Sequence, residues 1–322
     1  MTKPRIAVTM GDASGIGPEI IAAAWPEISD LCDPIVLGHH AIMERARKLR
    51  DVSQTITVID CVADDIVQTE PGRVDARSGE AAFQALVYGI EMVKRGEADA
   101  LVTAPLNKEA LHLAGHHYPG HTEILAERCG VQRFGMMLYL GPGENLAGTA
   151  GLAVDHVTLH TSMREAIEQI TMEAVFEKAM LIDDFMLMMK GERPRIGVCS
   201  LNPHAGEGGL FGREEIDIIA PAVKRAAAAG LSIEGPCPAD TIMVNAKNGR
   251  YDAVVAMFHD QGHIALKLLG MHRAVNITLG LPIIRTSVAH GTAFDQAWKG
   301  TAEIGSMIEA VRVATIMAAK KK

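Results

Sequence analysis

Aromatic side chains and long apolar runs are both scarce in this sequence. Only 4% of its 322 residues are Phe, Trp or Tyr, so a core has to be built from Ala, Val, Ile, Leu and 17 Met. This composition favours layered α/β packing over an all-β sandwich. A helix that crosses a bilayer needs about 18 or more apolar residues. No run approaches that length, so we expect no membrane segment.

Cysteine and positive charge are also limited. The five cysteines are scattered and form no Cys-x-x-Cys pair, which argues against a disulfide framework and favours a reducing compartment. The first ten residues lack the apolar core of a signal peptide, so we predict a cytoplasmic protein. Lys and Arg number 31 against 39 Asp and Glu, a net charge of −8. That charge argues against a nucleic-acid partner but allows a local basic pocket for an anionic small molecule.

Strand-like and helix-like segments alternate along the chain. Residues 78–95 carry apolar residues at helical spacing, and residues 196–200 and 253–257 are short apolar runs typical of buried strands. Residues 162–189 are predicted to be helical. The alternation predicts an α/β fold with parallel or mixed sheets. No linker separates two halves, so we expect two domains with a chain that crosses between them.

Three histidines, His156, His204 and His259, form the most specific constellation. Each follows or lies within a strand-like run, and ligands of open α/β sheets bind at the carboxyl ends of strands. Neutral imidazole is a common ligand of divalent metals, and three imidazoles leave positions open for substrate oxygens. The alternative is three hydrogen-bonding loop residues, and His160 and His263 compete for the same role.

A second group suits an anionic substrate. His121 and Thr122 follow a Pro-Gly turn, Lys267 lies two helical turns after His259, and Asn276 and Arg285 bracket a strand-and-turn run. Arginine offers a planar fork for phosphate or carboxylate, and lysine a point charge. A salt-bridged surface arginine is the alternative reading of Arg285.

Two glycine turns are weaker signals. The loop with Gly11, Gly15 and Gly17 matches no standard phosphate-binding pattern and is equally a turn between strand and helix. The turn at 290–295, with Gly291, Thr292 and Asp295, could hold an adenosine ribose through its carboxylate or be only a capped turn.

Longer motifs follow one another in order over residues 6–310. They are Met10-Gly11-Asp12 with Gly15-Ile16-Gly17-Pro18-Glu19, Ala104-Pro105-Leu106-Asn107-Lys108, Gly120-His121-Thr122-Glu123, Asn202-Pro203-His204-Ala205-Gly206-Glu207, His259-Asp260-Gln261-Gly262 and Asn276-Ile277-Thr278-Leu279-Gly280-Leu281-Pro282. Together they resemble the 4-hydroxythreonine-4-phosphate dehydrogenase (PdxA) family.

The resemblance implies an isocitrate/isopropylmalate dehydrogenase-like fold, with two α/β/α domains and the active site in the cleft between them. It implies a cofactor-side domain of residues 1–125 plus 275–322, and a metal-binding and dimerisation domain of residues 126–274. It also implies a homodimer whose active sites draw histidines from both subunits.

The resemblance further implies roles for individual residues. The metal ligands would be His156, His204 and His259, binding one divalent ion (Zn, Mg, Mn or Co) per site. The substrate contacts would be His121, Thr122, Lys267, Asn276 and Arg285. The turn with Gly291, Thr292 and Asp295 would bind NAD, with NADP as the alternative.

The implied reaction is the NAD-dependent oxidation of the C3 alcohol of a small 4-phosphorylated acid, followed by loss of C1 as CO2. The substrate is 4-phosphohydroxy-L-threonine, and the product is 3-amino-2-oxopropyl phosphate. A divalent metal suits both steps, because it lowers the pKa of the hydroxyl and stabilises the enolate. Lys267, Asp260 and His121 are the candidates for proton transfer.

Several positions depart from the family pattern and leave alternatives open. Ala13-Ser14 replaces a Pro-Ala pair in the first loop, Asp155 a threonine and Ala289 an aspartate. His263 and Leu268-Leu269-Gly270 look more like the branch acting on D-threonate or D-erythronate 4-phosphate, which would yield dihydroxyacetone phosphate. Aromatic cis-dihydrodiol dehydrogenases, phosphotransacetylase-like acyltransferases and a non-catalytic sensor are the remaining alternatives.

Overall fold

Strands and helices alternate through residues 3–143 and 145–321, which the computed structural model describes. The predicted α/β fold is confirmed. The chain forms two units: unit 1 is Met1–Gln132 with Leu281–Lys322, and unit 2 is Arg133–Gly280. The functional roles assigned to residues 1–125 plus 275–322 and to residues 126–274 stay predictions. Within the described residues, no helix combines the length and apolarity needed to cross a membrane.

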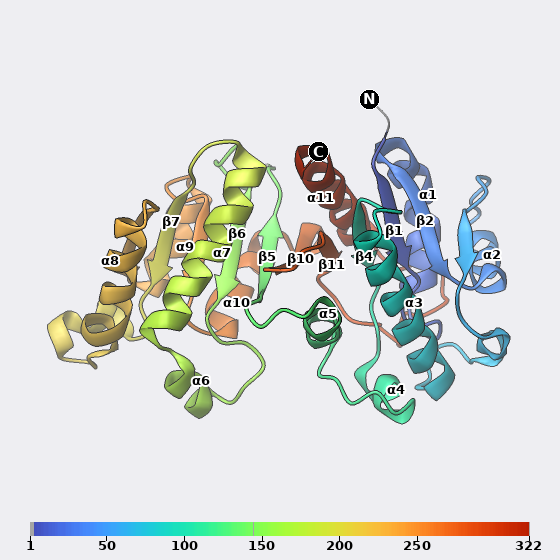
Figure 1. Ribbon diagram of the computed structural model, residues 1–322, viewed down its shortest axis with the longest axis horizontal. Coiled ribbons are helices and arrows are strands. Elements are labelled where there is room, and N and C mark those ends of the chain that lie inside the picture. The colour runs from blue at the N-terminus through green and yellow to red at the C-terminus, as the bar shows by residue number, and fades with distance from the viewer. Residues whose placement is uncertain (1–2, 144, 322) are drawn as a thin grey trace. The chain divides into compact units, whose positions relative to one another are not determined.

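Unit 1 is a parallel sheet with the strand order β3-β2-β1-β4-β11. From β1 to β3 each new strand is added on one side of the sheet, whereas β4 is added on the other side of β1. Right-handed crossovers therefore put α1 on one face of the sheet and α3 on the other. Helix α3 packs on β1 and β2, while α11 packs on β11, β4 and α1 (Figure 1). The elements are β1 (Arg5–Thr9), α1 (Gly17–Leu31), β2 (Asp33–Gly38), α2 (His40–Leu49), β3 (Val58–Asp60), η1 (Asp64–Gln68), α3 (Ala76–Lys94), β4 (Ala100–Thr103), α4 (Lys108–Leu113), α5 (His121–Cys129), β11 (Arg285–Val288) and α11 (Gly305–Lys321).

Unit 2 has a mixed sheet with the strand order β10-β5-β6-β9-β7-β8. Strand β5 is antiparallel to β10 and β6, and the other pairs are parallel. Helices α7 and α10 each pack on β6 and β9. Helix α9 packs on β7 and β9. The elements are β5 (Gly135–Leu140), β6 (Leu152–His156), α6 (Met163–Gln169), α7 (Met172–Lys190), β7 (Arg195–Cys199), η2 (Pro203–Gly209), η3 (Glu215–Ile219), α8 (Ala220–Ala228), β8 (Ser232–Cys237), α9 (Ala239–Lys247), β9 (Ala253–Ala256), α10 (His259–Gly270), η4 (Met271–Arg273) and β10 (Ala274–Leu279).

The helical prediction for residues 162–189 is confirmed except for an interruption at residues 170–171. Two helices, α6 and α7, occupy this stretch, because Ile170 is extended and Thr171 starts a new helix by accepting a hydrogen bond from the Ala174 backbone N–H. Ser162 caps α6 in a reciprocal capping box with Glu165. Both caps are Ser or Thr residues that helical periodicity alone does not reveal.

Candidate active site

A cluster of histidines lies at the carboxyl ends of β6 and β9 in unit 2. His156 is the last residue of β6 and pairs in register with Ala256 of β9, and His259 opens α10 three residues after that strand. The His156 and His259 ring centroids are 6.4 Å apart. His263, one turn further along α10, lies 4.6 Å from the His156 ring and stacks on the His259 ring at 3.8 Å.

The buried imidazoles of this cluster are neutral. Burial, followed by the neighbouring His263, holds the pKa of His156 well below its usual value. Burial, followed by His259 and Lys267, lowers the pKa of His263 to about 4. A neutral imidazole keeps a lone pair on one ring nitrogen, which is the form that binds a metal.

Asp260 hydrogen-bonds His259, the half-buried member of the cluster. Its Oδ1 accepts from His259 Nδ1 at 2.7 Å. This contact puts the proton on Nδ1 and leaves the lone pair on His259 Nε2, the arrangement common around metal-binding histidines. Asp260 is therefore suited to orienting His259.

A cavity of about 320 Å³ opens beside the cluster. It lies beyond the ends of β6 and β9, where ligands of α/β sheets bind. His160, His259 and Asp260 supply its ionisable groups, and Phe258 and Met163 contribute apolar wall. Of the residues predicted for metal binding and proton transfer, His259 and Asp260 thus border a space for a small molecule.

His204 does not join the cluster within one chain. It lies in η2, where residues 204–208 all have positive φ, and its ring contacts Glu207 and Phe211. Its side chain is 66% exposed. In the described part of the chain, no three His, Cys, Asp or Glu side chains are grouped to hold a metal. One chain therefore offers two suitable donors, His156 and His259, and the three-histidine ligand set stays a prediction.

Lys267 and Asn276 also belong to unit 2. Lys267 lies on α10 two turns after His259, close enough for its charge to lower the pKa of His263. Asn276 is on β10 with a buried Oδ1 that accepts no hydrogen bond from the described residues. A buried amide oxygen without a donor is unusual, and a substrate hydroxyl or ammonium group would satisfy it.

Arg285, the first residue of β11 in unit 1, is buried. The residue is 1% exposed, and its Nη2 donates to Thr103 Oγ1 at 2.6 Å. Thr103 Oγ1 in turn bonds the Ser287 hydroxyl at 3.0 Å. Burial lowers the pKa of Arg285 to about 9, so the guanidinium remains charged at neutral pH. The structure thus excludes a solvated surface arginine at this position.

His121 and Thr122 open α5 in the same unit. Burial, followed by the charge of Arg285, holds the pKa of His121 well below its usual value, so the ring is neutral. Glu123 in the first turn acts on Arg285 in the opposite sense and raises its pKa. Electrostatic coupling therefore links His121 and Arg285, two of the residues predicted to contact substrate.

The two glycine turns of unit 1 pack against each other. Ile16 N–H donates to the Thr292 carbonyl at 3.0 Å, and a Cβ on Gly15 would lie 2.9 Å from the Thr292 Cβ. Trp298 Nε1 donates to the Ala13 carbonyl at 2.8 Å. Ala293, within the predicted cofactor turn, has a φ of 42°, a strained value for a residue with a Cβ. Gly15 is therefore required for close packing, and the first loop supports the turn that carries Gly291, Thr292 and Asp295.

Sequence reasoning missed the hydroxyls of Thr103 and Ser287 around Arg285. Both are buried. The available signal was a polar residue within otherwise apolar runs, at the end of β4 and in β11. Asp155, which departs from the family pattern, is buried beside His156, and burial raises its pKa to about 6.

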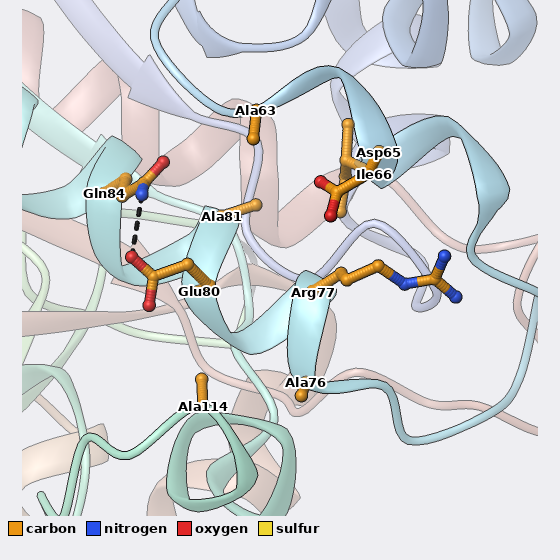
Figure 2. A pocket seen from close by; sticks show the side chains of 9 residues that line it. All are labelled: Ala63, Asp65, Ile66, Ala76, Arg77, Glu80, Ala81, Gln84 and Ala114. Atoms are coloured by element: carbon orange, nitrogen blue, oxygen red, sulfur yellow. Dashed lines mark hydrogen bonds between the residues drawn. The ribbon is translucent and has the colours of Figure 1, made fainter.

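A separate cavity of about 290 Å³ lies in unit 1 between η1 and α3 (Figure 2). Arg77 and Glu80 are among its charged side chains, and Gln84 donates to Glu80 at 2.7 Å. None of the predicted site residues lines it. This cavity is therefore distinct from the candidate active site.

Comparison with known proteins identifies the class of the chain as a dehydrogenase, an oxidoreductase. Residues 30–314 match the family model described as pyridoxal phosphate biosynthetic protein PdxA. The chain belongs to the PdxA family, as its motifs predicted.

Individual relatives match over nearly the full length. The chain is 42% identical to D-threonate 4-phosphate dehydrogenase of Salmonella typhimurium, over 99% of this chain and 100% of the relative. It is 44% identical to 4-hydroxythreonine-4-phosphate dehydrogenase of Beijerinckia indica, over 96% and 94%. The crystal structure of 4-hydroxythreonine-4-phosphate dehydrogenase from Klebsiella pneumoniae superposes with a TM-score of 0.85 at 43% identity, covering 98% of both chains.

Proposed function

We propose that this enzyme oxidises a 4-phosphorylated four-carbon 3-hydroxy acid with NAD, in the presence of a divalent metal, and decarboxylates the product. One observation carries the proposal: a chain of the PdxA family places the neutral imidazole of His156 6.4 Å from the ring of His259, which lines a cavity at the strand ends. In the oxidation, hydride leaves C3 for NAD+ and the C3 hydroxyl proton goes to a base. The C1–C2 bond then breaks, CO2 departs, and C2 takes up a proton.

His156 and His259 would hold the metal, with His204 of a second copy as the third ligand. When bound, a divalent cation lowers the pKa of the substrate hydroxyl and stabilises the negative charge that develops on decarboxylation. Asp260 orients His259 through the 2.7 Å contact. Lys267 and the neutral His121 then remain as the groups able to transfer protons.

Arg285 would bind the substrate phosphate. A buried guanidinium carries a desolvation cost that an anion offsets, which favours a phosphorylated substrate over an aromatic dihydrodiol. His121, Thr122, Lys267 and Asn276 would contact the rest of the substrate. The turn with Gly291, Thr292 and Asp295 would bind NAD, or NADP as the alternative.

Two substrates fit this chemistry. 4-Phosphohydroxy-L-threonine would yield 3-amino-2-oxopropyl phosphate, whereas D-threonate or D-erythronate 4-phosphate would yield dihydroxyacetone phosphate. The second is favoured by His263 and by Leu268-Leu269-Gly270, which resemble that branch, and by the relative named for D-threonate 4-phosphate.

A spectrophotometric assay of NADH formation with each phosphorylated acid tests the proposal. We expect turnover with at least one substrate, abolition by a chelator and recovery on addition of metal. Inertness toward all of them with metal present would refute it. Identification of the phosphorylated product decides between the two branches.

A homodimer would complete the metal site. Helix α10 exposes Ile264 and Leu268, and Met271 at the start of η4 continues this apolar stripe; Leu210 and Phe211 are exposed near His204. Such a surface suits contact with a second copy of the chain, and dimerisation would bring His204 to the partner's cluster. We also place the enzyme in the cytoplasm, in keeping with its five free thiols.

A further inference from the structure

His263 contacts two of the three histidines proposed as metal ligands, His156 and His259, yet it has no role in the reaction as proposed above. It is 6% exposed on the inner face of α10. Its Nδ1 lies 3.1 Å from His156 Nε2 and 3.2 Å from the His259 carbonyl oxygen. Its ring is also stacked on that of His259, with an angle of 12° between the planes.

The His259 carbonyl decides which nitrogen of His263 carries the proton. A carbonyl oxygen only accepts hydrogen bonds, so the Nδ1 facing it at 3.2 Å is the protonated nitrogen. The same N–H then points to His156 Nε2, which must be the unprotonated nitrogen of that ring. Contact with His263 thus selects the His156 tautomer whose Nε2 lone pair can bind a cation.

The parallel stacking shows that His263 acts through its neighbours. The lone pair of an imidazole nitrogen lies in the plane of its ring. Because the His259 and His263 rings lie in nearly parallel planes, their lone pairs do not point to one ion. Gly262 allows this close arrangement, because a Cβ there would lie 2.4 Å from His156 Nε2. His263 therefore packs against both rings and restrains them.

The His263 hydrogen bond also competes with a cation for the His156 lone pair. The net effect on metal affinity depends on whether this competition is larger or smaller than the gain from orienting the ligands. A net hydrogen bond shifts an equilibrium by at most about tenfold, and the His263 N–H keeps the His259 carbonyl as an acceptor when a cation binds. Loss of a residue that orients metal ligands typically costs about 10- to 100-fold in affinity. Orientation outweighs competition.

We propose that His263 is a positioning residue that fixes the His156 tautomer and the His259 ring plane for metal binding. The inference rests on the proposed function, since it takes His156 and His259 as the ligands. It extends that function by assigning part of the metal affinity to a side chain outside the ligand set.

The test measures metal affinity without substrate. The full-length protein is titrated with Zn²⁺ against a competing chelator, and the visible spectrum of the Co²⁺-loaded form is recorded. His263→Leu should weaken Zn²⁺ binding by about 10- to 100-fold and change the Co²⁺ spectrum. His263→Asn, whose side-chain N–H replaces that of Nδ1, should recover much of the affinity. The exposed His272 on η4 supplies the control variant, His272→Leu, which should bind like the wild type.

Three results would overturn the inference: affinity of His263→Leu within twofold of the wild type, tighter binding, or equal losses for the Leu and Asn variants. Circular dichroism and Tm establish folding, and His263→Gln replaces the Leu variant should the latter not fold. A wild-type protein that binds no metal would remove the proposed function as well. Normal wild-type binding and turnover with an unaffected His263→Leu would remove this inference alone.

Discussion

Replacing Arg285 with methionine separates the function of this buried side chain from its effect on stability. Methionine fills much of the same volume and carries no charge. In the wild type, the guanidinium is 1% exposed and bonds Thr103 at 2.6 Å. Arg285→Met therefore removes the proposed phosphate ligand and a buried charge in a single step.

The two consequences are opposite in sign. A hydrogen bond to a charged group contributes about 1.5–3 kcal/mol, so kcat/KM for the phosphorylated substrate should fall by about 10- to 150-fold. Exchange of a buried charge for a well-packed apolar residue is often neutral, or stabilising by about 1–4 kcal/mol. Thr103 retains Ser287 as a partner at 3.0 Å, so the free energy of unfolding should not decrease.

Initial rates of NADH formation and urea unfolding of the same samples measure both quantities. Arg5→Met is the matched control, because Arg5 is half exposed in the same unit and pairs with Asp33; its kcat/KM should equal that of the wild type. Unchanged kcat/KM in Arg285→Met would show that Arg285 does not bind the phosphate. A parallel loss of activity and stability would show that the arginine supports the fold.

Three further predictions follow from particular contacts. If His204 completes the partner's site, mixing inactive His204→Ala and His156→Ala subunits should restore about a quarter of wild-type activity, because half of the chains form mixed dimers with one intact site each; no recovery contradicts sharing. Asp12 is fully buried, and burial raises its pKa from 3.8 to about 6, so the folded state binds the extra proton and wild-type stability should fall as pH rises through this range. The stability of Asp12→Asn relative to the wild type should accordingly increase by about 2–3 kcal/mol between pH 4 and pH 7 in urea unfolding, and a constant difference would contradict the shift. Gly262→Ala places a Cβ 2.4 Å from His156 Nε2, so it should reduce Zn²⁺ affinity in chelator competition more than the unhindered Gly291→Ala, and equal affinities would show that the two rings can move apart.

The sequence predicted the elements that have a clear apolar pattern, but it did not reveal where a side-chain cap divides one helix from the next. Apolar periodicity and short apolar runs are sufficient to find α3, β7 and β9 to within about two residues. The division between α6 and α7 at Thr171 depends on one hydroxyl that accepts a backbone hydrogen bond, and the apolar pattern continues across it. Asp12 shows a similar limit: aspartate just before a helix is typical of an N-cap, but its carboxylate accepts from Ser14 N–H within the loop, and Ile16 stands at the N-cap of α1.

For the candidate site, residue types were predictable but their proximity was not. His156 and His259 are about a hundred positions apart, and only the parallel pairing of β6 with β9, which sets His156 level with Ala256, brings them to one edge of the sheet. His263 follows from His259 by helical spacing, because positions i and i+4 share a face of α10. Its contact with His156 depends on that strand register and on the missing Cβ of Gly262. A one-residue shift of β6 would turn His156 to the other face of the sheet and separate its ring from that of His259. The chemistry proposed for this enzyme therefore depends on sheet register as directly as on the histidines themselves.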